Sequence, residues 1–267
     1  MSIGVIRRMI SNFFEFVGRS VINTCNAAGA FVIFFARIFI TLFSTKLKIS
    51  KLLTQMVQIG SSSMAVVALT GASSGMALAL QSYIGFRRIG GEHMIGAIVA
   101  LGMIRELGPV LTGLMVTGRA GSAITAEIGT MQITEQIDAL RTLRINIFQY
   151  LMVPRVLASI IVMPLLALFT MLCGIIGGYI VCVYTLGLSP EDYQSAIRGY
   201  VEMSDIYGGM FKASIFGLIL TWVGTYKGYG THGGARGVGE STTKSVVMSS
   251  IMVLVSNYFI TKILENL

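Results

Sequence analysis

Long, strongly apolar stretches separated by short polar segments are the feature that most restricts how this chain can fold. Only 12% of the residues are charged, whereas soluble domains carry about 25%. A transmembrane barrel would instead show alternating strands of roughly ten residues. The sequence therefore predicts an all-α integral membrane protein, because a helix of roughly 20 apolar residues crosses a bilayer. The five predicted transmembrane helices are 56–86, 94–118, 150–186, 207–226 and 245–264.

The first 50 residues differ in character from the rest. Residues 1–20 carry apolar side chains at roughly helical spacing, interrupted by charges, which predicts an amphipathic interfacial helix. Residues 30–43 are strongly apolar but have Arg37 in their middle. We interpret them as an interfacial or half-inserted helix in preference to a sixth span. The sequence thus divides into N-terminal interfacial helices, 1–50, and a five-helix core, 51–267.

The distribution of basic residues predicts the orientation in the membrane. Segments 1–55, 119–155 and 227–244 hold most of the Lys and Arg residues, and with five spans all three lie on one side. The positive-inside rule makes that side cytoplasmic. The loop 187–206 on the other side is net acidic. The N-terminus is therefore expected to be cytoplasmic and the C-terminus periplasmic.

Several classes of chemistry find no support in the sequence. The chain has no GxxxxGK[ST] phosphate-binding loop and no HExxH zinc motif, and its three cysteines lack metal-ligand spacing. The basic residues lack the interleaved aromatics of a nucleic-acid surface. We expect no enzyme, no metal, no cofactor in this chain and no nucleic acid. Energy for uphill transport would come from a partner or an ion gradient.

Charged residues inside the apolar spans are the strongest local signal. Arg105 and Glu106 are adjacent and are followed by Pro109, which frees a backbone carbonyl one turn back. The pair either belongs to an ion network that fixes helix packing or forms a polar gate or headgroup contact. Each charge should be shielded by the other, by a second subunit or by cavity water. Lys212 is either a snorkelling anchor or a second charge facing the same cavity as Glu106.

Three further segments carry weaker signals. Small residues in 60–63 and 71–75 indicate close helix packing, either within the chain or at a subunit interface or pore. The polar interlude 119–149 contains the apolar stripe Ile133, Ile137 and Leu140, typical of a short amphipathic helix that Thr134 could cap. That helix would dock a partner or simply cover the surface. The glycine-rich segment 228–241 is interpreted as a flexible turn.

Four consecutive motifs follow one another along the chain: Arg105–Pro109, Gly118–Ala123, Ala126–Met131 and Thr134–Leu140. Together they closely resemble the MlaE/YrbE permease family of Mce-type ABC lipid transporters. The resemblance also includes Leu80-Gln81-Ser82-Tyr83, Pro154-Arg155 and Lys212, and it covers roughly residues 50–264. One departure is Glu240, followed by Lys244, where some members carry an arginine.

The resemblance implies a homodimeric permease that moves phospholipids between the inner and outer membranes. It implies a cytoplasmic ABC ATPase that binds ATP and Mg, a ring of Mce-domain subunits and, as an optional further partner, a STAS-domain subunit. The expected location is the bacterial inner membrane, with the plastid inner envelope as the open alternative. The alternative function is that of an ion- or proton-coupled secondary transporter or channel that uses Glu106. No internal sequence repeat, which many secondary transporters have, supports this alternative.

Two sets of site residues follow. The resemblance assigns a coupling helix, which docks on the ATPase, to the stretch from Glu127 to Leu140. We expect two copies of the first, second and fifth spans to meet around one lipid site, with small-residue patches allowing close approach. The coupling set is Glu127, Glu135, Gln136 and Asp138, and the lipid or cavity set is Leu78, Gln81, Tyr83, Arg105, Glu106, Lys212 and Met252.

Overall fold

The structure, a computed structural model, describes residues 3–44 and 49–266, and these residues form helices joined by short connections without a strand. This confirms the all-α prediction. The chain divides into two compact units, Met1–Thr45 and Lys46–Leu267. In the first unit, a single helix, α1, runs from Ile3 to Ser44, so the two predicted N-terminal helices are continuous.

Within the described part of the chain, six helical segments are long and apolar enough to cross a membrane by length and composition. Five of them match the five predicted spans, although the third ends at Thr185 rather than at residue 186, and the sixth, Val21–Phe43, lies within α1. The protein is therefore a multi-pass membrane protein. That residues 30–43 form an interfacial or half-inserted helix stays a prediction, and so does the functional division after residue 50.

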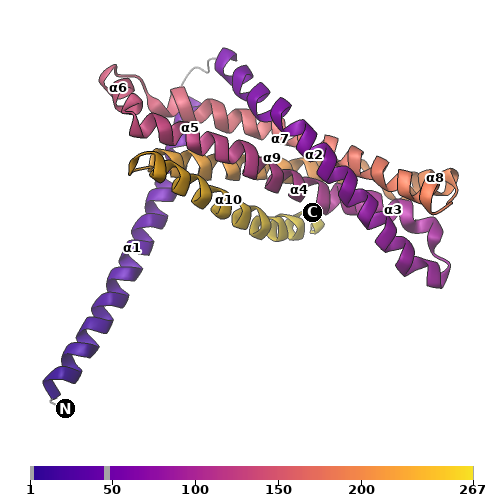
Figure 1. The fold of residues 1–267 in the computed structure, drawn as a ribbon, viewed down its shortest axis with the longest axis horizontal. Helices are drawn as coiled ribbons and strands as arrows, with labels where there is room; N and C mark the ends of the chain where they lie inside the picture. Colours follow the sequence, from indigo (N-terminus) through magenta and orange to yellow (C-terminus); the bar gives the residue numbers. More distant parts are fainter. Residues whose placement is uncertain (1–2, 45–48, 267) are drawn as a thin grey trace. The chain divides into compact units, whose positions relative to one another are not determined.

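The second unit begins with α2 and ends with α10, and Figure 1 shows its long helices lying side by side. Short 3₁₀ turns, η1 and η2, link α2 to the second span, which is a run of α-helix and π-helix segments. The elements are α2 (Ile49–Phe86), η1 (Arg87–Ile89), η2 (Glu92–Met94), α3 (Ile95–Gly102), η3 (Met103–Leu107), α4 (Gly108–Val116), η4 (Thr117–Gly121), α5 (Ser122–Ile133), α6 (Gln136–Thr142), η5 (Phe148–Met152), α7 (Val153–Ile180), η6 (Val181–Thr185), α8 (Pro190–Tyr200), α9 (Met203–Tyr229) and α10 (Gly234–Glu265).

The second span is longer than the sequence predicts. Residues 119–133, expected to form a polar interlude, continue the helix as far as Ile133. Hydroxyl groups there bond back to carbonyls one turn earlier: the Thr125 hydroxyl donates to the Gly121 carbonyl at 2.9 Å, and that of Ser122 to the Gly118 carbonyl at 2.6 Å. Because these hydroxyl groups are hydrogen-bonded within their own helix, the residues tolerate an apolar environment, although they count as polar in the composition.

Two further expectations about local structure are wrong. Thr134 does not cap α6, because its hydroxyl donates to the Thr130 carbonyl and ends α5, while Glu135 precedes α6 with φ 58°. The glycine-rich turn is confined to residues 230–233, since α10 begins at Gly234. Glycines in 234–241 therefore lie within a helix despite their poor helix propensity.

The small-residue stripe of α2 packs within the chain, against α7. A Cβ atom added to Gly75 would lie 1.9 Å from the carbonyl oxygen of Gly174, and one added to Gly71 would lie 2.6 Å from that of Thr170. Across the same seam, a Cβ on Gly177 would lie 2.5 Å from the Ala72 carbonyl. Glycines on both helices therefore let the backbones touch, which is how helices associate in lipid. At these positions intrachain packing is the correct alternative.

Contacts near the ends of the helices bring together parts of the three basic segments that the charge count places on one side of the membrane. The Arg141 side chain of α6 donates to the Tyr229 hydroxyl at the end of α9, and the Phe148 ring also packs on Tyr229. Lys51, near the start of α2, lies over the Tyr150 ring. Segments near residues 51, 141–150 and 229 therefore share one end of the unit, and the assignment of that end to the cytoplasm stays a prediction.

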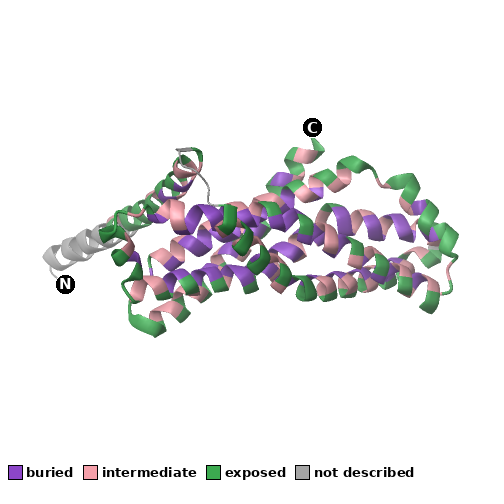
Figure 2. Cartoon of the chain, turned by 90° about the horizontal axis from the view of Figure 1, so that it is seen from above, coloured by how far each residue is buried: buried purple, intermediate pink, exposed green. Residues whose placement is uncertain are grey.

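Buried residues gather on the facing sides of the helices, and exposed residues cover the outer sides (Figure 2). Many exposed side chains are large and apolar, as expected for a surface in contact with lipid tails rather than water. Examples from α2, α7 and α10 are Leu69, Ile84, Leu165, Leu172, Leu254 and Phe259.

Candidate functional site

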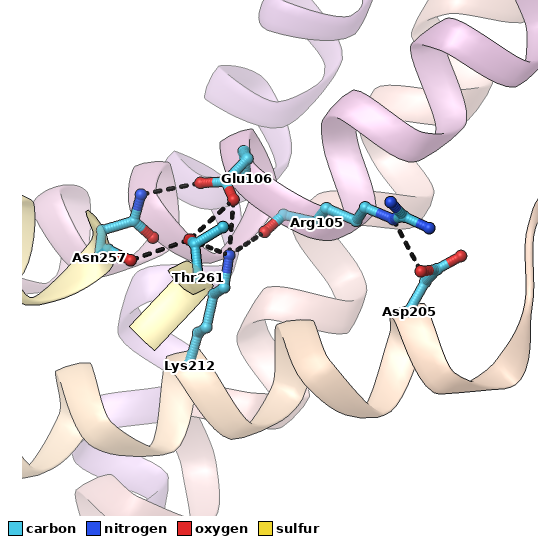
Figure 3. A network of polar contacts seen from close by, with 6 residues as sticks. All are labelled: Arg105, Glu106, Asp205, Lys212, Asn257 and Thr261. Atoms are coloured by element: carbon cyan, nitrogen blue, oxygen red, sulfur yellow. Dashed lines mark hydrogen bonds and ion pairs between the residues drawn. The ribbon is translucent and has the colours of Figure 1, made fainter. Parts of the chain in front are cut away.

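A polar network joins the second span to α9 and α10, and its centre is the ion pair between Glu106 and Lys212 (Figure 3). The Lys212 ammonium donates at 2.7 Å to Glu106 Oε1, at 2.7 Å to the Arg105 carbonyl and at 2.7 Å to the Thr261 hydroxyl. Its side chain is only 4% exposed, and all three of its protons are used. Lys212 is thus a buried partner of Glu106, and the alternative of a snorkelling anchor is wrong.

Proline explains why the lysine reaches a backbone carbonyl. Pro109 has no N–H to donate to the carbonyl of Arg105, four residues earlier, so that oxygen would lack its helical partner. Lys212 supplies the missing donor. The same stretch, η3, is a π-helix, a form that often marks functional sites because it alters the helical register. The freed carbonyl that the sequence predicts therefore has a definite partner.

Arg105 points away from Glu106 and pairs with a different residue of α9. Its Nε donates to Asp205 Oδ1 at 2.7 Å. The second Asp205 oxygen accepts from the backbone N–H of Glu202 at 3.1 Å, which completes a capping box at the start of α9. The Arg105 side chain is 56% exposed and that of Asp205 is 8% exposed. Arg105 therefore tethers the helix cap while leaving much of its guanidinium accessible.

These contacts show that the charges of Arg105 and Glu106 are compensated by residues other than those expected from the sequence. Neither Arg105 nor Glu106 is compensated by the other, because neighbouring residues on a helix point about 100° apart. Each is compensated instead by an opposite charge from α9 in the same chain. The network is therefore an ion network that fixes helix packing, and any contact with a lipid headgroup is a further proposal.

Two members of the network come from α10 and were missed by the sequence reasoning. Asn257 Nδ2 donates to Glu106 Oε2 at 2.8 Å, and the Thr261 hydroxyl lies 2.9 Å from both Glu106 Oε1 and the Asn257 carbonyl. Because one hydroxyl has one proton, Thr261 donates to one of these two oxygens while accepting from Lys212. The signal was available: the two residues lie four apart, on one face of an otherwise apolar helix.

An open groove of about 420 Å³ lies along α10 and contains Met252 of the predicted lipid set. Two lysines occur among its lining residues, and the others are mostly apolar. The lining residues are Lys227, Thr243, Lys244, Val247, Met248, Ile251 and Met252. Lys244 pairs with Glu240 at 2.7 Å, so the acidic residue that departs from the family pattern compensates the lysine that follows it.

The α2 members of the lipid set lie elsewhere. Leu78 and Tyr83 are partly buried and pack against a cluster that includes Val99, Met103 and Tyr193. Gln81 is exposed on the neighbouring face of α2. None of these three residues lines the groove that contains Met252. Within one chain the structure therefore does not bring the predicted lipid residues into one pocket.

Three of the four predicted coupling residues lie on or beside α6. Glu135, Gln136 and Asp138 are all exposed, whereas Ile137 between them is fully buried. Asp138 also forms an exposed ion pair with Arg141 at 2.8 Å. The amphipathic helix that the apolar stripe predicts is therefore present, with one apolar residue anchoring it and its polar residues accessible.

Glu127 differs from the other three because it lies on α5 and has an intrachain partner. Its Oε1 accepts from the guanidinium of Arg155 at 2.7 Å. The Arg155 side chain is 5% exposed and that of Glu127 is 43% exposed.

Among residues 3–44 and 49–266 no group of three or more His, Cys, Asp and Glu side chains that could hold a metal comes together.

Comparisons with known proteins agree with this architecture. The family model described as Permease MlaE matches residues 52–263. A probable ABC transporter permease protein of Rickettsia typhi is 43% identical over 96% of this chain and 99% of its own length. The intermembrane phospholipid transport system permease protein MlaE of Haemophilus influenzae is 36% identical over 96% and 98%. The chloroplastic protein trigalactosyldiacylglycerol 1 of Arabidopsis thaliana is 38% identical over 77% and 59%. With a family model matching most of its length, this chain belongs to the MlaE permease family.

Proposed function

We propose that this chain is the membrane-spanning permease subunit of an ABC transporter that moves phospholipids between the inner and outer membranes. The observation that carries the proposal is the match to the Haemophilus influenzae phospholipid transport permease, which extends over nearly the full length of both chains. Similarity of that extent includes every helix of the second unit, so the two proteins share more than a local motif.

The character of the surface supports a lipid substrate. The groove along α10 combines an apolar wall, including Met248 and Ile251, with the ammonium group of Lys227 and that of Lys244, which also pairs with Glu240. A phospholipid has the matching chemistry, with apolar tails and a phosphate that lysine can bind. The groove and the predicted residues Leu78, Gln81, Tyr83 and Met252 would contact lipid in the assembled transporter. Arg105, the exposed member of the network, is its best candidate for a headgroup contact.

The runner-up, a transporter or channel coupled to ions through Glu106, gains no support. Both oxygens of the Glu106 carboxylate are occupied within the chain, by Lys212, Asn257 and Thr261. A carboxylate that carries a transported proton or cation needs a free face toward the pathway. The geometry therefore favours a structural ion pair.

The proposal includes partners that supply what this chain lacks. A second copy of the chain would complete the lipid site, and a cytoplasmic ABC ATPase would bind ATP and Mg. A Mce-domain ring would receive the lipid outside, with a STAS-domain subunit as an optional further component. In the proposed orientation, α6 faces the cytoplasm of a bacterium. The chloroplastic relative keeps a plastid inner envelope as an alternative location.

The test is transport by the purified assembly. The permease would be reconstituted with its ATPase and Mce-domain partners in vesicles that contain fluorescent phospholipid, and acceptor vesicles would be added. We expect lipid transfer that requires ATP and stops when the nucleotide-binding lysine of the ATPase is replaced. Transfer driven by a proton or sodium gradient without ATP would instead support the runner-up.

A further inference from the structure

The Glu127–Arg155 ion pair joins the two helices that flank α6. It therefore lies where movement of α6 would be transmitted to the membrane-embedded helices. Glu127 is on α5, before α6, and Arg155 is near the start of α7, after α6. The pair therefore closes the base of a hairpin that carries α6 at its tip. Without the pair, this hairpin would be joined to α7 through the chain itself and through α9, on which both α5 and α7 pack.

The arginine is held in one position by its surroundings. One terminal nitrogen donates to the Leu151 carbonyl at 2.7 Å, and the other lies 2.7 Å from Glu127 Oε1. The Arg155 Nε is buried and has no hydrogen-bond partner among the residues that the structure describes. A buried guanidinium with one carboxylate partner depends strongly on that partner, because removing it leaves an uncompensated charge. The link is consequently rigid, and Glu127 is the side of it that water reaches.

The two linked helices share α9 as a neighbour and differ in their other main neighbour. The α5 helix packs chiefly on α9 and α10, whereas α7 packs chiefly on α2 and α9. The α7–α2 seam is the one in which glycine backbones touch, so a displacement of α7 would be passed directly to α2. Through α5 alone, movement of α6 would reach α9 and α10, and it would reach α7 only by way of α9. Arg155 adds a direct link from α5 to α7 and so to α2, which carries Leu78, Gln81 and Tyr83.

We propose that Glu127 and Arg155 are positioning residues that couple movement of α6 to α7 and α2, rather than contacts for the ATPase itself. The proposal rests on the proposed function, and it reassigns Glu127 within the predicted coupling set. The remaining coupling residues on α6 would make the docking contacts. Loss of the ion pair would then lower the amount of lipid moved per ATP without releasing the ATPase.

The test uses a double variant, Glu127→Gln with Arg155→Met, because replacing both partners removes the link without leaving a buried charge. In the reconstituted transporter we expect the ATPase to copurify as with the unaltered protein, and lipid moved per ATP hydrolysed to fall at least about fivefold. Glu191→Gln, which removes an exposed carboxylate on α8, is the control and should leave this ratio unchanged. The exchanged pair, Glu127→Arg with Arg155→Glu, should recover much of the ratio.

A second readout separates this proposal from the proposed function. A cysteine at Gln81, placed in the unaltered and the double-variant backgrounds, would be labelled with a maleimide with and without ATP and vanadate. We expect nucleotide to change the labelling rate in the unaltered background and to have no effect in the double variant, whatever the transported molecule is. Equal nucleotide effects in both backgrounds, or loss of the ATPase from the double variant, would overturn the proposal. Failure of the phospholipid assay alone would count against the proposed function only.

Discussion

The helices α7 and α10 are both long and apolar, yet they are held in the molecule in different ways. In the most apolar stretch of the span Phe148–Thr185, 56% of the residues are buried, against 17% for Gly234–Glu265. The seam of α7 with α2 consists of glycine and carbonyl groups in contact. The attachment of α10 includes polar side chains, at Ser245 toward Thr125 and at Asn257 and Thr261 toward Glu106.

The difference reflects what can hold helices together in lipid. Apolar side chains gain little by leaving lipid for protein, so association depends on close backbone packing or on polar bonds. The first gives a broad seam that resists movement, because protein interiors are dense and deform poorly. The second gives a few separate attachment points. We infer that α7 and α2 move together as one rigid body, whereas α10 presents its outer face to lipid or to a second subunit.

The largest effect is expected at the α2–α7 seam. Gly75→Ala would place a methyl group 1.9 Å from the Gly174 carbonyl oxygen, and overpacking of this kind costs about 3 kcal/mol or more. Gly85→Ala in the same helix is the matched control, because nothing lies within 4 Å of its added Cβ. Thermal unfolding in detergent would compare them. Equal melting temperatures for the two variants would show that the seam is not tightly packed.

The next effect is expected at the polar attachment of α10. Lys212→Met should lower the stability of the permease by about 3 kcal/mol, since it leaves the Glu106 carboxylate without its charged partner. Glu106 is partly exposed, which limits the penalty to the lower end of the range for buried pairs. The double variant with Glu106→Gln should recover part of the loss in the same melting experiment. Additive losses would mean that the two residues do not interact.

A smaller effect is expected at the other attachment point of α10. The Thr125 and Ser245 hydroxyls are hydrogen-bonded at 2.9 Å, and both residues are buried. A double-mutant cycle of Thr125→Val and Ser245→Ala should give a coupling energy of about 1 kcal/mol, the usual value for a neutral hydrogen bond. Chemical unfolding in mixed micelles would supply the four free energies. A coupling energy near zero would leave the network around Glu106 as the main polar attachment of α10.

The smallest effect is expected at the surface of α10. Glu240→Gln removes an ion pair with Lys244 in which both side chains are more than 60% exposed. Exposed pairs one turn apart contribute little because water screens them. The melting temperature should stay within experimental error of the unaltered protein. A clear drop would indicate that this end of α10 is covered, for example by a second copy of the chain.

Several elements of the fold and site could be predicted because single residues or local patterns carry them. Charges such as Arg105 and Glu106 stand out in an apolar span, and Pro109 predicts a free carbonyl wherever it occurs in a helix. The apolar stripe Ile133, Ile137 and Leu140 predicted a short amphipathic helix, and the last two of these residues lie in α6 while Ile133 ends α5. The extension of the second span to Ile133 was missed, because hydroxyl residues that bond to their own helix look polar in the sequence.

The sequence by itself determined the helical class, the position of the apolar spans and the presence of charges that need partners. These properties depend on composition and spacing, because an apolar segment in lipid must satisfy its own backbone hydrogen bonds and therefore forms a helix. Only the tertiary structure decided which partner each charge takes: Asp205 for Arg105, Lys212 for Glu106, and Arg155 for Glu127. Those partners lie far apart along the chain, and no local pattern specifies which helix faces will meet. Pairing of this kind follows from how all the helices pack at once.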